Sequence, residues 1–548
     1  MQTSELSKVK QDLIAEIKQR VDDHVLEPSN AELLTKLITQ ADNDNEAISI
    51  AALGTTYKRT GLHFDKRLER LTHDICYFRK NEKLSFHTDD SKPTHKLIIG
   101  DNYDALQNLL IQYKGAIDVI YIDPPYGKDS MGEFAQTNYQ NAITRDNLLS
   151  MLYPRLELAK QLLSDSGVIF CSIDDKNQAY VKCLFDEVFG ERNYLTTLPR
   201  KGSGGRQDSK QYAVVHEYVV VYSSNIIDYE AGRMTKDNEG FKFVDKKGRK
   251  YKTQLLRKWG DNSRRQDRPN LYYPIFYSPL SASLTLDRIE QADVEIYPML
   301  DATKEGRWRF GKTTMQRAIN DGIVEVQKNK KGEYIPYERI YEDQASDTKP
   351  FSTWIDDIDN STGSTLLKEV IGDGVFDYPK PVDLITRLLK MASPKKDIVV
   401  LDFFAGSGTT GHAVLDLNRS EEKEGDLFAD TNNGGNRTFI LCQMNEKTDT
   451  TPNGIAYDVT AKRLKRIMTG ECYDVTKDFE WIHKNKPYGG NLDVYEIDRV
   501  ADFEYSEGKS PFEVIDETLY GQQRFATLQE KINWVCTHFD NARKQLDE

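Results

Sequence analysis

Short apolar runs alternate with helical repeats of apolar residues after about residue 80. The elements predicted there, in order, are a strand, turn and helix over 96–113, a buried strand over 116–126, a helix over 144–167 that ends near Gly167, a buried strand over 168–174 and a helix over 177–190. Strands and helices that alternate in this way are typical of a parallel α/β sheet.

The alternation stops at about residue 200, where charged, aromatic and glycine-rich segments are mixed, and it returns near residue 376. The elements predicted in this later part are a helix over 379–393, a strand, glycine loop and helix over 397–417, and a buried strand over 437–446. The sequence therefore predicts an α/β core with an inserted, mixed α+β domain. The predicted divisions are a helical N-terminal region at 1–80, core halves at 81–198 and 376–475, the insert at 199–375, and a C-terminal region at 476–548.

The composition is that of a soluble globular protein, with 38% hydrophobic and 29% charged residues among 548. No apolar run approaches the roughly 20 residues of a membrane-spanning helix. The first 20 residues have an amphipathic pattern that differs from a signal peptide. Six cysteines are scattered without C-x-x-C spacing, which suggests neither a zinc site nor a disulfide framework. We expect a cytoplasmic protein without a metal centre.

Charge is unevenly distributed along the chain. The net charge of -13 argues mildly against a nucleic-acid partner, but residues 246–268 carry ten Lys/Arg against two Asp, and 199–210 form a second basic run. A dense basic segment in an acidic chain is expected of a nucleic-acid-binding face. A solvated loop would have the same composition, so charge alone leaves both interpretations open.

One strand exit carries a distinctive tetrapeptide. The apolar run 119–122 ends in Asp123-Pro124-Pro125-Tyr126. Proline has no N–H to donate to a neighbouring strand, so the strand must stop here. Asp123 and Tyr126 are therefore presented at the end of a buried strand, although an incidental carboxylate at a proline-rich strand end would look the same.

A second strand exit, at residues 399–408, is predicted to bind a ligand. Apolar residues lead to Asp402, and then Phe404-Ala405-Gly406-Ser407-Gly408 precede a helix. Glycines let the backbone turn tightly and let a ligand approach the main chain. The start of the helix adds oriented N–H groups. Neither a G-x-G-x-x-G pattern nor a P-loop lysine follows, which argues against NAD and ATP.

This loop resembles the S-adenosylmethionine loop of class I methyltransferases, and with D-P-P-Y it resembles that of the DNA amino-methyltransferases. Here the tetrapeptide precedes the glycine loop, which is the permuted order of the β group of that family. The resemblance implies a circularly permuted, Rossmann-like α/β methyltransferase fold, with the inserted α+β domain as the target-recognition domain. "GVIFCSIDD" and "HEYVVVY" match scaffold motifs of the same group.

The resemblance also implies a set of site residues. Asp101, at the end of "IIGD", would lie beside the cofactor's adenosine, and Lys380 with Pro381 would line its methionine end. The family's ribose-binding acid falls on Gln443, with Glu446 three residues later, so both are candidates. The implied cofactor-binding set is Asp101, Lys380, Pro381, Asp402, Phe404, Ala405, Gly406, Gly408, Thr409, Gln443 and Glu446, and the implied catalytic set is Asp123, Pro124, Pro125 and Tyr126.

The tetrapeptide suits methylation of an exocyclic amine, whose lone pair is delocalised into the base. The Asp123 carboxylate and the Pro124 carbonyl can accept the two N–H bonds, which turns the lone pair toward the methyl donor. Tyr126 offers a face for stacking, worth about 1–3 kcal/mol per base in single-strand sites. Because the amine is buried in duplex DNA, the base must be flipped out of the helix.

Most of the chain resembles the modification (Mod) subunits of type III restriction-modification systems, through "TGLHFD" at 61–66, "FGERNY" and "FDYPKPVDLI". That resemblance implies adenine N6 as the target, double-stranded DNA as the substrate, a homodimer, and an ATP-dependent restriction (Res) subunit as a partner. Residues 127–129, Gly-Lys-Asp, depart from the usual Asn-Thr-Gly. A cytosine-N4 methyltransferase, which more often begins the tetrapeptide with Ser, and a stand-alone enzyme without a restriction partner are the alternatives.

Two further segments have competing interpretations. Residues 216–218, His-Glu-Tyr, could be a catalytic or metal-binding pair, but the start of a strand makes a scaffold role the favoured interpretation. Trp308 and Phe310 could stack on bases or form a small core of the inserted domain.

Overall fold

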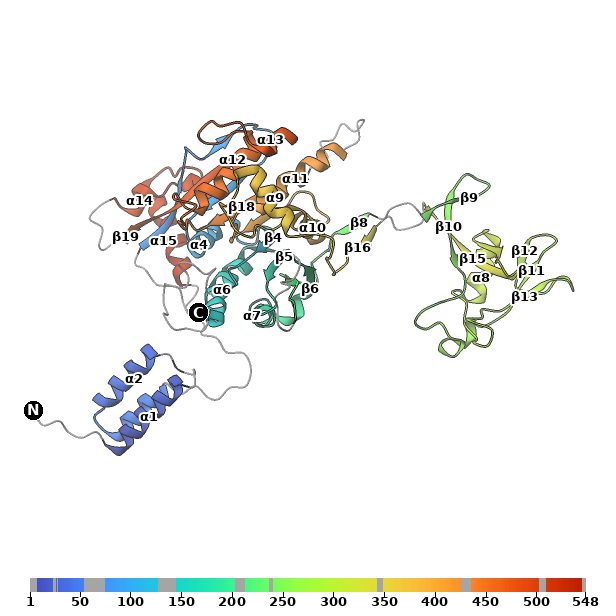
Figure 1. The fold of residues 1–548 in the computed structure, drawn as a ribbon, viewed down its shortest axis with the longest axis horizontal. Helices are drawn as coiled ribbons and strands as arrows, with labels where there is room; N and C mark the ends of the chain where they lie inside the picture. Colours follow the sequence, from blue (N-terminus) through green and yellow to red (C-terminus); the bar gives the residue numbers. More distant parts are fainter. Residues whose placement is uncertain are drawn as a thin grey trace, which may run out of the picture. The chain divides into compact units, whose positions relative to one another are not determined.

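The computed structural model describes residues 7–22, 26, 28–53, 74–126, 144–202, 212–235, 240–342, 348–424, 435–501 and 509–544. Residues 61–66 and 127–129, which entered the sequence comparison, lie outside these ranges. The chain divides into two compact units, one of Met1–Gly232 with Phe351–Glu548 and one of Arg233–Pro350 (Figure 1).

A sheet of ten strands, counted over the described residues, forms the centre of the first unit. Its order is β1-β19-β3-β18-β17-β4-β5-β7-β6, with β2 paired to β19. Neighbours from β19 to β5 are parallel, whereas β7 is antiparallel to β5 and β6, and β1 and β2 are antiparallel to β19. The strands are β1 (Asp74–Lys80), β2 (Phe86–His87), β3 (Thr94–Ile99), β4 (Ile117–Ile122), β5 (Leu163–Ile173), β6 (Tyr194–Lys201), β7 (His216–Ser223), β17 (Val399–Asp402), β18 (Thr438–Gln443) and β19 (Asn491–Ala501).

The central strands are mostly apolar because helices cover both faces of the sheet. Along β4, Val119 and Tyr121 pack into one core cluster, and Ile120 and Ile122 pack into the other. The helices on the first face are α9 (Ser361–Ile371), α10 (Val382–Ala392), α11 (Thr409–Glu424), α12 (Lys462–Thr469) and α13 (Glu480–Lys484). Those on the second face include α4 (Asn102–Tyr113), α6 (Thr144–Leu162), α7 (Gln178–Phe189) and α15 (Leu528–Lys544). The α/β prediction is therefore confirmed for this unit.

The helix predicted over 144–167 is too long. Helix α6 ends at Leu162, and Leu163 already pairs with Ile117 of β4. The chain thus enters the sheet before Gly167, because β5 already begins at Leu163.

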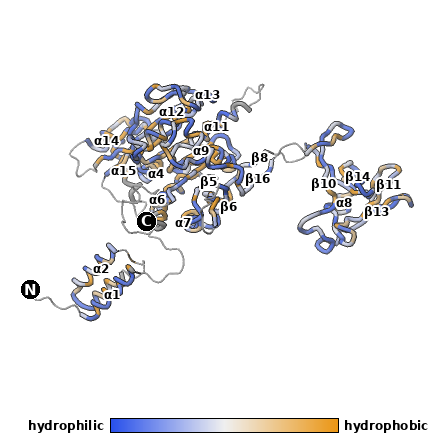
Figure 2. Tube along the Cα trace, in the orientation of Figure 1, coloured by the Kyte–Doolittle hydropathy of each residue, from blue (hydrophilic) through white to orange (hydrophobic). Residues whose placement is uncertain are grey.

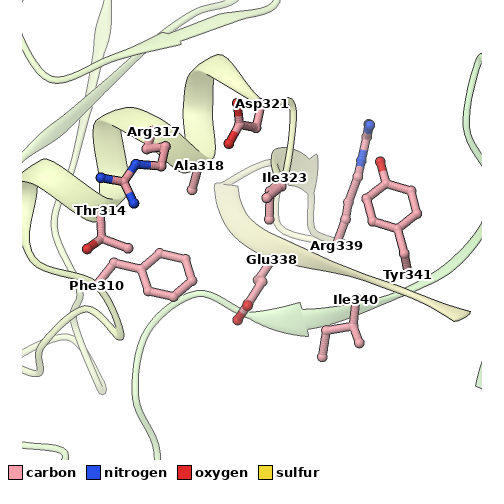
Figure 3. A pocket seen from close by; sticks show the side chains of 10 residues that line it. All are labelled: Phe310, Thr314, Arg317, Ala318, Asp321, Ile323, Glu338, Arg339, Ile340 and Tyr341. Atoms are coloured by element: carbon pink, nitrogen blue, oxygen red, sulfur yellow. The ribbon is translucent and has the colours of Figure 1, made fainter. Parts of the chain in front are cut away.

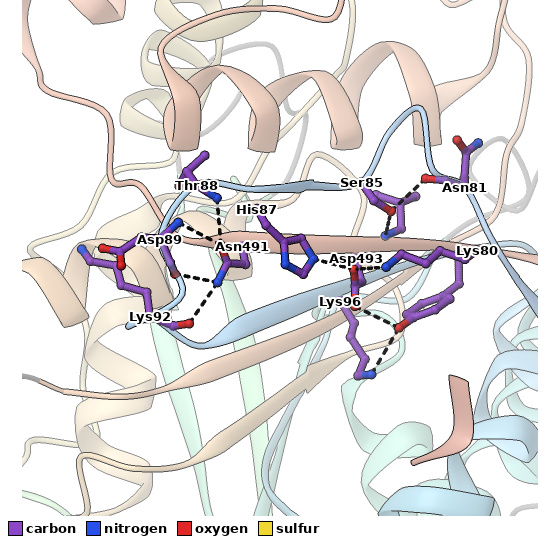
Figure 4. A network of polar contacts seen from close by, with 12 residues as sticks. Lys80, Asn81, Ser85, His87, Thr88, Asp89, Lys92, Lys96, Asn491 and Asp493 are labelled. Atoms are coloured by element: carbon purple, nitrogen blue, oxygen red, sulfur yellow. Dashed lines mark hydrogen bonds and ion pairs between the residues drawn. The ribbon is translucent and has the colours of Figure 1, made fainter. Parts of the chain in front are cut away.

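The sheet also extends past the predicted division at residue 475, since β19 lies between β1 and β3. Figure 4 shows the polar contacts that hold it there. Asp493 lies 2.8 Å from the Lys80 ammonium and 2.9 Å from His87 Nε2, and Asn491 donates hydrogen bonds to the carbonyls of Asp89 and Lys92. The strand therefore connects the C-terminal region to the first strands of the chain.

The second unit is a mixed α+β domain, narrower than the predicted insert at 199–375. Strand β7 and helix α9 fall inside that interval but belong to the first unit, because the apolar residues of β7 pair between β5 and β6. Its elements are β8 (Arg233–Thr235), β9 (Phe243–Val244), β10 (Lys250–Leu255), β11 (Ile275–Ser278), β12 (Ser283–Thr285), β13 (Val294–Ile296), α8 (Lys312–Asn320), β14 (Val324–Lys328), β15 (Tyr334–Tyr341) and β16 (Thr348–Pro350).

The aromatic pair of "RWRFGK" lies inside the second unit. Trp308 is 1% exposed, and its indole N–H donates to the Tyr273 carbonyl at 2.7 Å, so the core interpretation is correct for this residue. Phe310 faces a cavity of about 280 Å³ beside α8 and β15 (Figure 3). The cavity is lined by Phe310, Thr314, Arg317, Ala318, Asp321, Ile323, Glu338, Arg339, Ile340 and Tyr341.

Three helices near the N-terminus, α1 (Lys8–Asp22), α2 (Pro28–Gln40) and α3 (Asp44–Leu53), share a small core around Ile17, Ile38 and Ala47. Hydrophobic and hydrophilic stretches alternate along α1 and α2, as expected of amphipathic helices (Figure 2). Across the described ranges, every helix is too short or too polar to pass through a lipid bilayer.

Candidate active site

Four parallel strands deliver the predicted site residues to one edge of the sheet. β4 ends immediately before Asp123, β3 ends two residues before Asp101, β17 ends at Asp402, and β18 ends at Gln443. The carboxyl ends of parallel strands share one edge, which is where ligands bind in open α/β sheets. The strand order therefore brings together residues that lie more than 300 positions apart in the sequence.

The D-P-P-Y segment is held by an internal hydrogen bond and by side chains from two other parts of the first unit. The Tyr126 hydroxyl donates to Asp123 Oδ1, and the Lys380 ammonium lies 3.2 Å from the same oxygen and donates to the Tyr126 hydroxyl at 3.1 Å. Asn177, at the start of α7, donates to the Tyr126 carbonyl at 3.0 Å. Pro124 is buried. The predicted catalytic residues and the predicted Lys380 thus form one cluster.

Lys380 is held in place by α9 on one side and by the glycine loop on the other. A Cβ atom on Gly363 of α9 would lie 2.4 Å from the Pro379 carbonyl oxygen, so only glycine permits this close packing. The Thr409 hydroxyl donates to the Lys380 carbonyl at 3.2 Å. Pro381 follows as the N-cap of α10. These contacts connect the loop of the predicted cofactor site directly to the catalytic cluster.

A buried ion pair that sequence reasoning missed continues the cluster. Lys380 donates to Glu217 Oε2 at 2.9 Å, and the Arg200 guanidinium donates to Glu217 Oε1. The side chains of Arg200, Lys380 and Glu217 are 0%, 11% and 13% exposed. Arg200 and Glu217 face each other across β6 and β7. Glu217 is therefore part of the site, whereas the favoured interpretation of residues 216–218 was scaffold, and no spacing in the sequence indicates its pairing with Arg200.

Burial and charge act in opposite directions in this cluster. Burial raises the pKa of Asp123, although Lys380 and the Tyr126 hydroxyl oppose the rise. Burial alone would lower the pKa of Lys380, but the charges of Asp123 and Glu217 outweigh it and the pKa is raised. The pKa of Glu217 is lowered, since Lys380 and Arg200 outweigh its burial. Lys380 and Glu217 therefore keep their charges, and Asp123 depends on Lys380 for its own.

The glycine loop has a fixed shape. Gly406 has φ 52°, in the left-handed region, and a Cβ there would lie 3.3 Å from the Phe376 ring. Its N–H donates to Gln443 Oε1 at 2.6 Å, and its carbonyl accepts from the Thr460 hydroxyl at 2.6 Å. Gly408 also has a left-handed φ, of 77°. The loop conformation therefore requires glycine at both positions. Gln443 at the end of β18 and the Thr460 hydroxyl hold the loop in this shape.

Arg463 supports the same loop from helix α12. This side chain of α12 is 1% exposed and donates to the Ser407 carbonyl at 3.2 Å and to the Thr409 hydroxyl at 3.0 Å. A π-helical turn, Ala456–Ala461, precedes it. Such turns occur frequently at functional sites. This contact could not be predicted from the sequence, because no motif connects the residues of α12 with the loop.

Asp402 supports the loop from inside the core. It is 2% exposed, its Oδ1 accepts from the Phe404 N–H at 3.0 Å, and its Oδ2 accepts from the Thr410 hydroxyl at 2.5 Å. Burial raises the pKa of Asp402 to about 7, against the effect of these hydrogen bonds. Phe404 packs against Phe403, with ring centroids 5.3 Å apart, and Ala405 is buried.

Asp101 connects β3 to the loop through its neighbours. It is the N-cap of α4, accepts from the Tyr103 N–H at 2.7 Å and lies 3.0 Å from the Arg155 guanidinium. Arg155, 1% exposed, also donates to the Asn102 side chain, which donates to the Phe403 carbonyl at 2.8 Å. The Asp101 side chain is 30% exposed, so its carboxylate remains accessible to a ligand.

The two candidates for the ribose contact differ in their surroundings. The side-chain oxygen of Gln443 accepts from the Gly406 N–H, and its side-chain nitrogen donates to the Met444 carbonyl. The backbone carbonyl of Glu446 accepts from the Ile455 N–H at 2.8 Å. Gln443 therefore shapes the loop, and the ribose contact stays a prediction for both residues. Within the described ranges, no cluster of three His, Cys, Asp or Glu side chains is placed to hold a metal ion.

The fold and the site together define an α/β enzyme of the doubly wound type, with a glycine loop and a strand-exit carboxylate at the carboxyl edge of the sheet. The N6/N4 DNA methylase family model matches residues 117–450. The chain therefore belongs to the N6/N4 DNA methylase family, a class of DNA methyltransferases. A model of an uncharacterised conserved protein family matches residues 3–119.

The chain is also similar to individual proteins. The Mod subunit of the type III restriction-modification enzyme EcoPI, from Escherichia phage P1, is 30% identical over 473 residues, which are 78% of this chain and 69% of that protein. The type II methyltransferase M.KpnI, from Klebsiella pneumoniae, is 31% identical over 392 residues, 70% of this chain and 88% of that protein. Among solved structures, the cytosine-N4-specific PvuII DNA methyltransferase is 10% identical with a TM-score of 0.33, over 64% of this chain and 83% of that one.

The buried Asp402 gives a testable pH dependence. Its folded pKa of about 7 lies above the roughly 3.9 of an unfolded Asp, so the folded chain binds the proton more tightly and loses stability as the pH rises from about 4 to 7. Asp402→Asn removes this titration. We expect the thermal unfolding midpoint of the variant, relative to wild type, to rise by roughly a few degrees between pH 5 and pH 8. Asp165→Asn, at an exposed position of β5, is the control, and a pH-independent difference for Asp402→Asn would contradict the assignment.

Proposed function

We propose that the protein transfers a methyl group from S-adenosyl-L-methionine to N6 of a flipped adenine in double-stranded DNA. The single observation that carries this proposal is the contact cluster of Asp123, Tyr126 and Lys380 beside the glycine loop. Membership of the DNA methylase family supports the reaction class. The strand order, in which β17 and β18 lie between β3 and β4, supports the permuted methyltransferase arrangement.

The residues of the site fit this cofactor. Two left-handed glycines, Gly406 and Gly408, leave two positions of the loop backbone without side chains. The accessible Asp101 carboxylate can accept hydrogen bonds from hydroxyl groups. When bound, S-adenosyl-L-methionine supplies an electrophilic methyl group on a sulfonium. Asp101, Gln443 or Glu446 would hold its adenosine part, and Lys380 with Pro381 its methionine end.

The chain's own residues orient the amine. In the proposed reaction, Asp123 accepts one N–H bond and the Pro124 carbonyl accepts the other, so that the nitrogen lone pair points toward the methyl donor. Tyr126 stacks on the flipped base, and the buried strand exit keeps water away from the reacting atoms. Positioning of two reactants in this way can supply a large part of a rate enhancement. No covalent intermediate on the protein is required.

Adenine is the proposed base because the tetrapeptide begins with Asp. The N6/N4 family includes enzymes of both specificities by its name, so cytosine N4 is the second candidate. The Mod subunit relative supports a role as the modification and recognition subunit of a type III system, and the type II relative supports the alternative of a stand-alone enzyme. We propose the type III role, with the cytoplasm as its location.

Substitution of the strand-exit carboxylate tests the reaction. We expect Asp123→Ala to lower methyl transfer to duplex DNA by at least about 100-fold, because the amine loses its acceptor. Transfer from labelled S-adenosyl-L-methionine, followed by nucleoside mass spectrometry, should show N6-methyladenine for wild type. Calorimetry should show little change in cofactor affinity. Asp165→Ala is the exposed control, and full transfer by Asp123→Ala or N4-methylcytosine as the product would contradict the proposal.

The second unit is the proposed target-recognition domain, and its charge supports this role. Residues 233–350 contain 24 Lys/Arg and 18 Asp/Glu, a net charge of +6, whereas the rest of the chain has 50 against 69, a net charge of -19. Nucleic-acid affinity depends chiefly on contacts of Lys and Arg with phosphates. The acidic chain thus concentrates its excess of positive charge in one compact unit.

An exposed tryptophan lies within the basic segment of this unit. Trp259 is 61% exposed and is followed by Gly260 and Asn262, which have left-handed φ angles of 75° and 55°. The turn is secured where the Lys258 N–H donates to the Arg307 carbonyl at 2.9 Å. Aromatic rings among cations are typical of surfaces on which bases stack. We propose that this turn contacts DNA.

Trp259→Ala should weaken DNA binding without changing the fold, since the side chain is exposed. Loss of one stacking contact of about 1–3 kcal/mol predicts a drop in affinity of roughly 5- to 100-fold, and Trp259→Phe should retain most of the affinity. Fluorescence anisotropy of a labelled duplex at fixed salt measures this. Leu280→Ala, at a position 85% exposed in the same unit, is the control. Equal affinities for Trp259→Ala and wild type would rule out the contact.

The proposed partners are a second copy of this chain and a restriction (Res) subunit, and similarity to the Mod subunit of a type III restriction-modification enzyme supports the second of these. The N-terminal helices offer an apolar surface for such contacts, since Leu33 and Leu37 of α2 are exposed one helical turn apart. Apolar side chains at this spacing form a continuous stripe on a helix.

Charges on that stripe should disrupt assembly. We expect wild type to be a dimer by light scattering after size-exclusion chromatography, and Leu33→Glu/Leu37→Glu to shift it to the monomer, because burying a carboxylate in an apolar interface is unfavourable. Leu280→Glu should leave the dimer intact. A monomeric wild type would refute the homodimer, and a dimeric double variant would refute this interface.

A further inference from the structure

Four charges of alternating sign lead from the core to the proposed catalytic carboxylate. The order is Arg200, Glu217, Lys380 and Asp123, and the two ionic contacts of the Lys380 ammonium measure 2.9 Å to Glu217 Oε2 and 3.2 Å to Asp123 Oδ1. The two positive and two negative groups sum to zero. A neutral set of this kind can be buried without leaving an uncompensated charge.

The arrangement places two donors on one oxygen of the proposed catalytic carboxylate. Asp123 Oδ1 accepts from the Tyr126 hydroxyl and is in contact with the Lys380 ammonium. A carboxylate oxygen has room for about two hydrogen bonds. An incoming amine can use this oxygen only if one of these donors moves to another acceptor.

Glu217 is the acceptor available to Lys380. Its carboxylate already receives the shorter of the two ammonium contacts, and its other oxygen is held by the fully buried Arg200. Lys380 can therefore release Asp123 and still keep Glu217 as an ionic partner. Such a movement leaves Lys380 charged and keeps its field near Asp123.

We propose that Glu217 is a positioning residue that shares Lys380 with Asp123, so that Asp123 can exchange the ammonium for the amino group of the target base. The inference rests on the proposed methyl-transfer function and identifies a residue that this function did not require. In this arrangement Arg200 fixes Glu217, Glu217 fixes Lys380, and Lys380 keeps Asp123 ionised until the base arrives.

A purely structural role for Glu217 predicts different behaviour. If Glu217 only neutralised the buried Arg200, its removal would reduce stability and activity whether or not Lys380 were present. If Glu217 acts through Lys380, its effect on turnover must disappear when Lys380 is removed. Residues that act as one unit show this non-additivity in a double-mutant cycle.

The cycle uses Glu217→Gln, Lys380→Met and the double variant, with kcat and KM for duplex DNA measured for each. We expect Glu217→Gln to lower kcat about 10-fold or more with a smaller change in KM, and the double variant to match Lys380→Met within about twofold. Glu421→Gln is the matched control, since Glu421 forms a similarly buried ion pair with Arg437. If the fold-losses in kcat of the two single variants multiply in the double variant, the proposal is overturned.

A second measurement does not depend on activity. Acetylation of Lys380 by acetic anhydride, followed against pH by peptide mass spectrometry, reports its protonation, which Asp123, Glu217, Arg200 and Tyr126 surround. Glu217→Gln removes one carboxylate, so the labelling curve should move to lower pH than in wild type and in Glu421→Gln. An unchanged curve would overturn the proposal even if methyl transfer is observed. A shifted curve with a wild type that transfers no methyl group would support the Lys380 contact and refute only the methyl-transfer function.

Discussion

The half-buried carboxylate at the exit of β4 is the constraint on which the proposed site depends. For the proposed reaction, Asp123 must stay ionised to accept a hydrogen bond from an amine, yet burial raises its pKa. The Lys380 ammonium at 3.2 Å opposes this rise, and Glu217 with Arg200 compensates Lys380 in turn. The series of compensating charges therefore ends at the fully buried guanidinium of Arg200, which lies on one of the antiparallel strands of the sheet.

The same need for fixed geometry explains why the two halves of the sheet are joined by polar contacts at one edge. Asn102 of the first half donates to the Phe403 carbonyl of the second half, and the Thr409 hydroxyl of the glycine loop donates to the Lys380 carbonyl. Arg463 holds the loop from α12. A shift of the loop would therefore be transmitted to the D-P-P-Y segment through Lys380.

In the proposed function, chemistry and DNA contact fall to different units with different charge. The cluster around Asp123 lies in an acidic unit and its four charges alternate in sign, whereas the basic residues around Trp259 lie in a unit of net positive charge. A buried charge must be compensated locally, but a phosphate-binding surface must keep its positive charges available to DNA. Separate units satisfy both conditions in one chain.

The sequence by itself determined the α/β alternation and the exits of β4 and β17, because apolar runs, prolines and glycines act locally. It also predicted that Asp123 and Lys380 would serve one site, through resemblance. Only the tertiary structure decided that the candidate site includes Glu217, Arg200, Arg155 and Arg463. It also decided that β19 joins the sheet and that Asp402 faces the core. These outcomes depend on strand pairing and on desolvation across long stretches of chain, and neither leaves a periodic pattern in the sequence.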